Sequence, residues 1–547
     1  MMVELRRLGL VAALCFAAAA PSLAQAGPQV DAPAGRLEGT TDGDLAVFKG
    51  IPYAVPPLGA LRWTPPRPLP AWTGLRKADA FGPACYQPKF PGTSVYTADL
   101  GPMSEDCLTL NVWAPKAAHE APVLVWIHGG AFTTGSSSEV IYDGARLASR
   151  GIVLVSINYR LGVFGWLAHP GLSAESPQKI SGNYGLLDQI EALRWIKRNI
   201  AAFGGDPKNV TVFGESSGGL SVVYLLAAPP ARGLFAKAIA QSSYLISTPE
   251  LRQAKYGAIS AEDAGTKLGE KLHAPDIAAL RALDGSGLAN AVAVAGFAPF
   301  GTVDGIVLPR QIIDTFDKGE QAPVPVIAGF NSGEIRSLRV LAPPVPASAA
   351  DYEKTIRERY GELADAFLKL YPGTDLQESI WATTRDGLYG WTAERLARKQ
   401  TALGQPAYLY LFDHGYPAED SAGYHAFHAS ELPFVFGTYD RTPSYWPKIP
   451  ATEDQVKFSD AMIDYWTSFA RSAKPVAKDE PAWQPYDSTG AYMAFGDVPT
   501  PSEHLMPGMY DLNETVVCRR HALGTLGWNW NVGLVSPPLP PPAPGCP

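Results

Sequence analysis

Short apolar runs alternate along the chain with longer segments in which apolar residues recur at helical spacing. The runs that we predict as strands span residues 123–127, 152–157, 210–213, 236–240, 324–328 and 408–412. They are apolar on both faces, and helical spacing lies between them, for example over residues 184–202. Strands buried on both faces and separated by helices are typical of a mostly parallel sheet that helices cover on both sides. The pattern therefore predicts an α/β fold.

Two further helical segments, residues 258–295 and 352–404, lie between predicted strands of the same sheet. Because the chain returns to that sheet after each segment, we interpret them as parts of insertions and not as independent domains. We place the insertions around residues 244–323 and 335–405 of a single domain over residues 27–536. Their helices are expected to shape a substrate pocket.

The first 26 residues have the three parts of a secretory signal peptide. Arg6 and Arg7 precede an apolar stretch at residues 8–20, and Ala24-Gln25-Ala26 forms an A-x-A cleavage site. The apolar stretch is too short to span a bilayer and no other segment is a candidate transmembrane helix, so we expect no stable membrane insertion. The sequence predicts cleavage after Ala26 and a secreted or periplasmic protein.

Four cysteines follow the predicted cleavage site, at Cys85, Cys107, Cys518 and Cys546. In an exported chain this number suggests two disulfides. Three pairings are possible, and proximity in the sequence favours Cys85–Cys107 and Cys518–Cys546; buried free thiols are the alternative. Cys546 lies in a Pro-rich tail, residues 537–547, which we otherwise expect to be poorly ordered.

Composition and charge exclude several classes of protein. The 547 residues are 46% hydrophobic and 18% charged, as in an ordinary globular protein and unlike a disordered or coiled-coil chain. The formal charge is −8, and the chain contains no basic stripe. Nucleic acids and anionic membranes are therefore poor candidate partners.

The strongest chemical signal is a G-x-S-x-G pentapeptide at residues 214–218, with Ser216 at its centre. It directly follows the predicted strand 210–213 and precedes a helix that we expect to begin near Gly219. A sharp turn between a strand and a helix lifts a serine hydroxyl out of the sheet and exposes it as a nucleophile. An ordinary serine at the start of a helix is the alternative.

A serine hydroxyl attacks a carbonyl only when a base takes its proton, so one of the nine histidines must serve it. In proteins with this turn the acid and the base follow the nucleophile in the chain, which excludes the histidines before Ser216. Attack also requires N–H donors for the developing oxyanion. His128-Gly129-Gly130-Ala131 follows the predicted strand 123–127 and is similar to the H-G-G loops that supply such donors, although a plain Gly-Gly turn is the alternative.

A series of ordered motifs covers nearly the whole chain after residue 26. It comprises Gly50-Ile51-Pro52-Tyr53-Ala54, Leu61-Arg62-Trp63, Ser104-Glu105-Asp106-Cys107-Leu108 with Leu110-Asn111, His128 to Phe132, Asn158-Tyr159-Arg160, Gly185-Leu186-Leu187-Asp188-Gln189, Phe203-Gly204-Gly205-Asp206-Pro207, the turn at 214–219 and Phe434-Val435-Phe436-Gly437. With these motifs the chain resembles type-B carboxylesterases and cholinesterases, a family of the α/β-hydrolase superfamily. The resemblance implies the α/β-hydrolase fold.

The resemblance also implies the two partners of Ser216. In this family the base precedes an acidic residue and an F-V-F-G run, and His428, followed by Glu431, has that register. His425 is the alternative base, and otherwise a surface histidine. The family's acid is a Glu in a G-x-N-x-D-E-like segment, which implies Glu334 at the end of residues 329–334. Gly333 stands where an Asp is common.

By the same register, the oxyanion donors are the backbone N–H groups of Gly130, Ala131 and Ser217. The family usually has Ala after the nucleophile, so Ser217 is a departure whose hydroxyl either touches the acyl group or bonds locally. Cys85–Cys107 matches the family's first disulfide loop. Arg62 with Glu105, and Arg160 with Asp188, are similar to its buried structural ion pairs.

The substrate pocket is harder to assign. Cholinesterases place a Trp in the first disulfide loop to face a quaternary ammonium group. This loop contains no Trp, so the chain does not resemble a cholinesterase in substrate choice. The resemblance places Phe297 and Phe300 near the acyl pocket, and Tyr96 is a further candidate from the loop.

We therefore expect a secreted serine carboxylesterase that hydrolyses small-molecule carboxylic esters through an acyl-enzyme intermediate. The reaction requires no metal and no cofactor, and the sequence implies no obligate protein partner. Two alternatives remain: a lipase-like hydrolase of acylglycerols, and, from a different class, a non-catalytic binding module related to cholinesterases.

Overall fold

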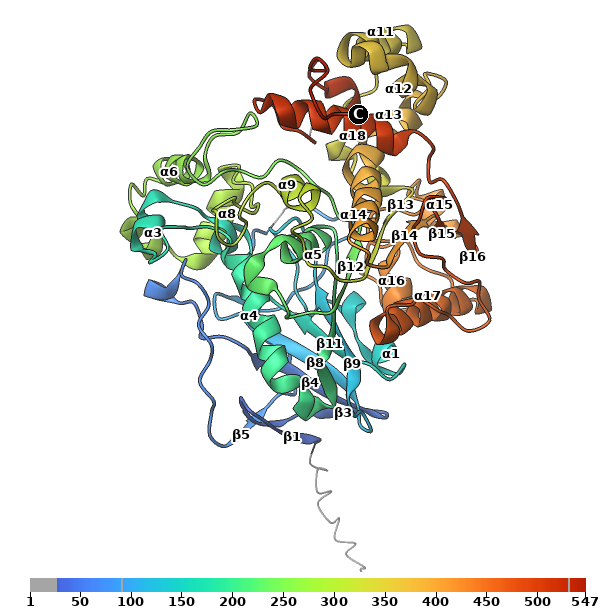
Figure 1. Ribbon diagram of the computed structural model, residues 1–547. Helices are drawn as coiled ribbons and strands as arrows, with labels where there is room; N and C mark the ends of the chain where they lie inside the picture. Colours follow the sequence, from blue (N-terminus) through green and yellow to red (C-terminus); the bar gives the residue numbers. More distant parts are fainter. Residues whose placement is uncertain (1–26, 90–91, 530–531) are drawn as a thin grey trace, which may run out of the picture.

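One mixed sheet organises the computed structural model, which describes residues 27–89, 92–529 and 532–547 (Figure 1). In this part of the chain the sheet has 11 strands in the order β16-β15-β14-β13-β12-β11-β9-β10-β8-β4-β3. The strands are β3 (Thr40–Asp42), β4 (Leu45–Pro52), β8 (Thr109–Pro115), β9 (Ala121–Ile127), β10 (Val153–Ile157), β11 (Gly205–Glu215), β12 (Lys237–Gln241), β13 (Val326–Asn331), β14 (Ala407–Phe412), β15 (Tyr492–Phe495) and β16 (Pro499–Ser502).

Pairing is parallel from β10 to β15 and antiparallel at both margins of the sheet. The six apolar runs correspond to β9 through β14, which confirms the expected mostly parallel sheet. Among the described residues, five short strands lie outside this sheet: β1 (Gln29–Ala32), β2 (Gly35–Glu38) and β5 (Leu75–Lys77) form one small sheet, and β6 (Ala84–Cys85) pairs with β7 (Met103–Ser104).

Helices cover both faces of the sheet because central strands are apolar on both sides. In β9, Val123, Val125 and Ile127 pack with α4, α5 and α14, whereas Leu124 and Trp126 pack with α1, α16 and α17 on the other face. The helices of these two layers are α1 (Ala145–Ala148), α4 (Tyr184–Asn199), α5 (Ser217–Ala227), α14 (Trp391–Ala402), α16 (Leu432–Phe436) and α17 (Glu453–Ser472). The expected two-sided covering is confirmed.

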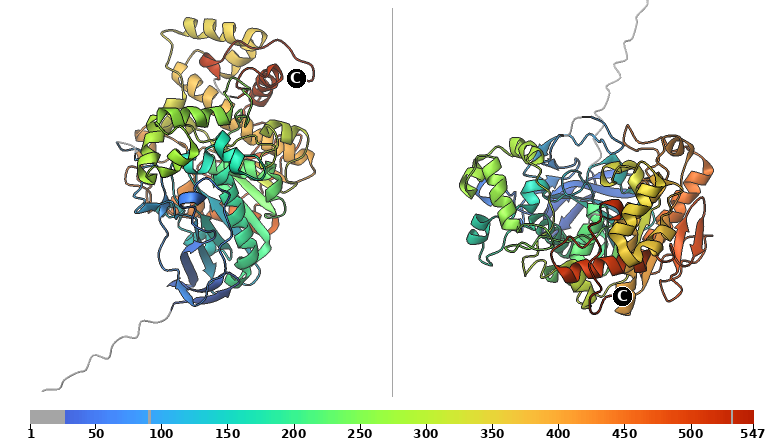
Figure 2. Two further views of the ribbon diagram at one scale, coloured as in Figure 1. Left: turned by 90° about the vertical axis from the view of Figure 1, so that its left-hand side faces the viewer. Right: turned by 90° about the horizontal axis from the view of Figure 1, so that it is seen from above.

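The remaining helices lie mainly over the end of the sheet opposite β1 and β5 (Figures 1 and 2). They are α2 (Gly162–Trp166), α3 (Pro170–Glu175), α6 (Ala261–Lys271), α7 (Ile277–Ala282), α8 (Gly285–Val294), α9 (Ile312–Asp317), α10 (Glu334–Ser337), α11 (Ala349–Tyr360), α12 (Ala364–Leu370), α13 (Leu376–Arg385), α15 (Pro417–Ser421) and α18 (Met509–Leu523). Helices α6–α9 connect β12 to β13, and α10–α14 connect β13 to β14. Both insertions therefore start and end in the one sheet.

Both disulfides form with the pairings that proximity favoured, Cys85–Cys107 and Cys518–Cys546. The Pro-rich tail differs from its predicted disorder. The N–H of Leu539 donates to the carbonyl of Arg359 at 2.7 Å, and Pro540 is buried. An extended Pro-rich strand has free carbonyls and a fixed shape, so it can dock against α11 and α18 beside the second disulfide.

The predicted signal peptide, residues 1–26, lies outside the described residues. Within the described ranges, none of the helices is both long enough and apolar enough to cross a membrane.

Candidate active site

Ser216 lies in the turn between β11, which ends at Glu215, and α5, which begins at Ser217. Its backbone has φ 59° and ψ −124°, a conformation that non-glycine residues rarely adopt and that costs about 1–3 kcal/mol. The turn is tight, because a Cβ atom at Gly214 would lie 2.6 Å from the carbonyl group of Gly218. The strand–turn–helix context expected from the sequence is therefore present, and the helix begins two residues earlier than predicted.

Glu334 and His428 meet at the carboxyl ends of β13 and β14. Glu334 begins α10 directly after β13, is fully buried, and accepts a hydrogen bond from Nδ1 of His428 through Oε2. Its other oxygen, Oε1, accepts the N–H of Asn331 at 2.9 Å. Both carboxylate oxygens are therefore held, which fixes the orientation of the imidazole.

The close packing at this junction explains why residue 333 is a glycine. Its N–H donates to the carbonyl of Ala426 at 3.0 Å, and a Cβ atom at this position would lie 1.9 Å from the carbonyl oxygen of His425. The loop that carries His428 therefore packs directly on the backbone before Glu334. Glycine is required for this approach, whereas a longer residue would force the two segments apart.

A second carboxylate, Glu215, lies beside the same imidazole. Its Oε1 is 3.0 Å from Nε2 of His428, an ion-pair distance without hydrogen-bond alignment. Among the described residues, no hydrogen bond joins Ser216 Oγ to His428. Burial raises the pKa of Glu215, and the nearby imidazolium only partly opposes this. Burial alone would lower the pKa of His428, but the charges of Glu215 and Glu334 outweigh it and raise this pKa.

A buried hydrogen-bond network joins the turn of Ser216 to the other two segments. The carbonyl of Gln241 accepts the N–H of Ser216 at 3.0 Å, and the Gln241 side chain donates to Oε1 of Glu431 at 2.8 Å. Oε2 of Glu431 in turn accepts from Nδ2 of Asn331, also at 2.8 Å. Burial raises the pKa of Glu431, and these two donors oppose that rise. The network therefore holds three segments at one end of the sheet in fixed relation.

The Gly-Gly loop after β9 lies against the same serine. A Cβ atom at Gly129 would be only 3.1 Å from Cβ of Ser216, so glycine permits this approach. Gly130, Ala131 and Phe132 follow with φ values of 99°, 55° and 56°. In the described part of the chain, the N–H groups of Gly130 and Ala131 donate to no protein acceptor. They are free to bind an oxygen of a ligand.

The hydroxyl of Ser217 bonds locally, one of the two possibilities left by the sequence. Ser217 is fully buried, and its Oγ accepts the N–H of Phe132 at 3.1 Å. The side chain therefore connects the first residue of α5 to the Gly-Gly loop.

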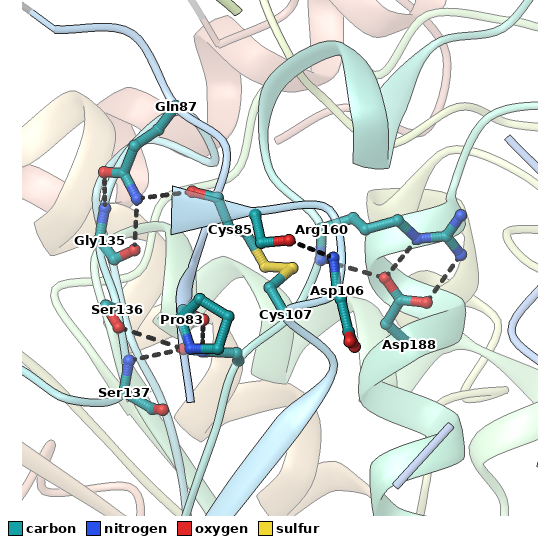
Figure 3. Close-up of a disulfide and its surroundings, with 12 residues drawn as sticks. Pro83, Cys85, Gln87, Asp106, Cys107, Gly135, Ser136, Ser137, Arg160 and Asp188 are labelled. Atoms are coloured by element: carbon teal, nitrogen blue, oxygen red, sulfur yellow. Dashed lines mark hydrogen bonds and ion pairs between the residues drawn. A yellow bond between two sulfur atoms is a disulfide. The ribbon is translucent and has the colours of Figure 1, made fainter. Parts of the chain in front are cut away.

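The first disulfide loop contacts both sides of this region. Gln87 exchanges two hydrogen bonds with the backbone of Gly135, at 2.9 and 3.0 Å, just beyond the Gly-Gly loop (Figure 3). The Tyr96 hydroxyl donates to the carbonyl of His428 at 2.8 Å, and Ser337 Oγ lies 2.6 Å from the same hydroxyl. Tyr96 therefore lies beside the loop of His428, with its hydroxyl bound to that loop, and its role toward a substrate stays a prediction.

Tyr389 forms another side of the site, with its ring centroid 5.4 Å from that of His428. It belongs to a π-helical turn, Asp386–Gly390, between α13 and α14. Such a turn contains one residue more than an α-helical turn and is frequent at functional sites. The sequence reasoning gave Tyr389 no role.

The predicted acyl-pocket residues separate in the structure. Phe297 lines a small apolar cavity of about 20 Å³ together with Val163, Phe164 and Thr133, next to the Gly-Gly loop. Phe300 does not line it and packs, partly buried, against the main core. Their role toward a substrate stays a prediction.

His425 is bound elsewhere. Its Nδ1 lies 2.7 Å from Asp420 and its Nε2 lies 3.3 Å from Asp413, and the side chain is 40% exposed.

The two structural ion pairs are present: Arg62 contacts Glu105, and Arg160 contacts Asp188 at 2.7 Å (Figure 3). Among the described residues, no group of three or more His, Cys, Asp and Glu side chains could hold a metal ion.

The sequence reasoning missed three residues of the site besides Tyr389. Glu215 lies inside the G-x-S-x-G pentapeptide, and Glu431 lies inside the motif that identified His428. Both residues were part of these motifs, but neither was assigned a function. Gln241 could have been found only as the residue that directly follows the predicted strand 236–240.

The chain is similar to known carboxylesterases over most of its length. The profile of the carboxylesterase family matches residues 26–510. The para-nitrobenzyl esterase of Bacillus subtilis (strain 168) is 36% identical over 450 residues, which cover 81% of this chain and 89% of the relative. The fumonisin B1 esterase of Sphingopyxis macrogoltabida is 35% identical over 482 residues, covering 84% and 85%.

Solved structures are similar over the same extent. A para-nitrobenzyl esterase superposes with a TM-score of 0.77 at 33% identity, covering 88% of this chain and 99% of its own. The carboxylesterase Est55 of Geobacillus stearothermophilus gives 0.71 at 33% identity with the same coverage. The chain therefore belongs to the carboxylesterase family, has the α/β-hydrolase fold, and is a serine carboxylesterase.

Proposed function

We propose that Ser216, His428 and Glu334 form the catalytic triad of this carboxylesterase. The observation that carries the proposal is the hydrogen bond between the buried Glu334 carboxylate and Nδ1 of His428, beside the strained turn of Ser216. A carboxylate at Nδ1 leaves Nε2 as the nitrogen that accepts a proton.

The reaction has two steps. Oγ of Ser216 attacks the ester carbonyl carbon while Nε2 of His428 takes its proton, and the carbonyl oxygen becomes an oxyanion. The imidazolium then gives this proton to the departing alcohol, which leaves an acyl-enzyme. A water molecule attacks the acyl carbon, again losing its proton to His428, and the acid is released as Ser216 recovers the proton.

The surrounding groups support each charge that forms. Glu334 and Glu215 flank the two nitrogens of His428, so the imidazolium is stabilised on both sides. The N–H groups of Gly130 and Ala131 have no protein acceptor among the described residues, and the N–H of Ser217 belongs to the first turn of α5. We assign these three groups to the oxyanion.

A fluorophosphonate probe tests the nucleophile. It should label one serine stoichiometrically, and Ser216→Ala should abolish both labelling and ester hydrolysis. Ser243→Ala is the matched control, because Ser243 is a buried serine close to Gly219 whose hydroxyl has no hydrogen-bond partner. Stoichiometric labelling of Ser216→Ala would refute the assignment.

The location of the enzyme outside the cytoplasm is part of the proposal. Two disulfides are typical of oxidising compartments, and the N-terminal segment has the parts of a signal peptide.

A further inference from the structure

Ser217 makes a contact that its role as a backbone donor does not require. Its side chain is fully buried, and Oγ accepts the N–H of Phe132 from the Gly-Gly loop at 3.1 Å. The hydroxyl therefore bridges the N-terminus of α5 and the segment that carries the N–H groups of Gly130 and Ala131.

This contact helps to restrain a backbone of unfavourable shape, together with the N–H groups of Thr133 and Thr134, which both donate to the carbonyl of Gly130 at 2.9 Å. Gly130, Ala131 and Phe132 all have positive φ, which is unfavourable for the two residues with a Cβ atom. The peptide group between Ala131 and Phe132 is bonded at both ends: its N–H donates to Ser217, and its C=O accepts from Oγ1 of Thr133 at 3.2 Å.

Phe132 itself is fixed beyond that peptide. Its carbonyl accepts the N–H of Gly162 at 2.7 Å, and its buried ring lies 4.3 Å from that of Trp166. Of the three residues with positive φ, Ala131 is exposed and Gly130 half-buried, whereas Phe132 is fully buried, so Gly130 and Ala131 are the two that a ligand can reach. On the side of the serine turn, the bond to Ser217 is the hydrogen bond nearest to the exposed N–H groups; on the other side, the carbonyl of Gly130 is held by the N–H groups of Thr133 and Thr134.

We infer that the Ser217 hydroxyl is a positioning group for oxyanion stabilisation. By holding the Ala131–Phe132 peptide, it keeps the neighbouring N–H groups of Gly130 and Ala131 aimed at the oxygen that forms when Ser216 attacks. One residue then acts twice, through its own N–H and through its side chain. The inference rests on the proposed function, since it assumes that Ser216 is the nucleophile.

The test compares Ser217→Ala with Ser221→Ala. Ser221 lies one turn further along α5, is equally buried, and also accepts one hydrogen bond, from Nε2 of Gln189 at 2.9 Å. Each variant removes one buried hydroxyl and leaves one buried N–H group without its acceptor. We therefore expect a similar fall in melting temperature for both, and a catalytic effect for Ser217→Ala alone.

The deciding measurement is inhibition by a trifluoromethyl ketone analogue of the ester. Oγ of Ser216 adds to its carbonyl carbon, the proton moves to His428, and the carbonyl oxygen becomes an oxyanion. Ser217→Ala should weaken this inhibition and lower kcat by roughly tenfold or more, less than the 10²–10³ that follows loss of a whole donor. KM should change less than about threefold. The Ser221→Ala variant should retain wild-type inhibition.

Two outcomes would overturn the inference. One is unchanged inhibition by the trifluoromethyl ketone in Ser217→Ala; the other is an equal loss in Ser221→Ala, which would make the effect one of general stability. If Ser217→Ala does not fold, Ser217→Cys replaces it, since a thiol is a weaker acceptor and should give an intermediate loss. Phosphonate labelling of Ser216 tests the proposed triad independently. If the labelling is retained in these variants, a negative result contradicts the role of the Ser217 hydroxyl and leaves the triad assignment in place.

Discussion

Nε2 of His428 lies 3.0 Å from Oε1 of Glu215, the residue that directly precedes Ser216. The carboxylate is buried, so its charge is poorly screened and acts strongly on the imidazole. It favours the imidazolium that forms during catalysis, and it equally favours the protonated resting base that cannot accept a proton.

Replacement of Glu215 by Gln should therefore change the pH dependence in a defined direction. Without the carboxylate the imidazolium is less stable, so the pKa of His428 falls, and the acid limb of kcat/KM moves to lower pH. Maximal kcat should fall as well. Glu419→Gln is the control, a buried carboxylate that does not contribute to the raised pKa of His428. An acid limb that stays in place or moves upward in Glu215→Gln contradicts this account.

The two neighbouring histidines should differ sharply when replaced. We expect His428→Ala to lower kcat roughly 10³-fold or more, because it removes the base, and His425→Ala to stay within about tenfold. His425 is bonded to Asp413 and Asp420, and in the described part of the chain it forms no hydrogen bond or ion pair with Glu334. Steady-state kinetics of both variants decide the matter, and the reverse ranking would show that the base is misassigned.

Opening the first disulfide loop should affect binding and stability together. Closing the loop between Cys85 and Cys107, 22 residues apart, is worth about 3 kcal/mol by chain entropy. The loop also carries Tyr96, which bonds to the carbonyl of His428. Replacing both cysteines by Ser should lower the melting temperature and raise KM, while Ser216 still reacts with a small phosphonate.

The second disulfide provides the comparison for that experiment. Cys518–Cys546 holds the tail against helices far in sequence from the triad, so Cys518→Ser with Cys546→Ser should leave KM close to wild type. An unchanged KM in the Cys85/Cys107 variant would show that this loop does not contribute to substrate binding.

Export predicts a specific mature protein. Mass spectrometry of the secreted or periplasmic form should show an N-terminus at Gly27 and no free thiols, because all four remaining cysteines are paired. Detection of the uncleaved N-terminus, or of cysteines that remain as free thiols, would argue against export.

The sequence predicted those strands that are apolar on both faces. β9 to β14 each appear as an apolar run, whereas β8 does not, because it contains the buried Asn111. That residue is tolerated through hydrogen bonds to Ser137, Ser156 and the N–H of Gly50. β16 was missed because it is short and contains two prolines, which fit only at an edge.

The candidate site was predictable where its residues lie in local motifs. Ser216 follows from the residues around it, and His428 and Glu334 required the resemblance to a family. The electrostatic surroundings were not predictable, because they depend on contacts between distant segments. Gln241 and Glu431, for example, are 190 positions apart and meet only after the sheet has formed.

The π-helical turn at Asp386–Gly390 sets a limit on how this enzyme can evolve. The turn accommodates its extra residue locally, so deleting one residue there would restore α-helical geometry and leave the two flanking helices on nearly the same faces. Trp391, fully buried and bonded to Glu514, would keep its place in the core, whereas Tyr389, which lies within the turn, would lose its position beside His428. We therefore expect single substitutions across this turn to be tolerated and single-residue deletions to inactivate the enzyme. The length of the segment is then inherited more strictly than its sequence.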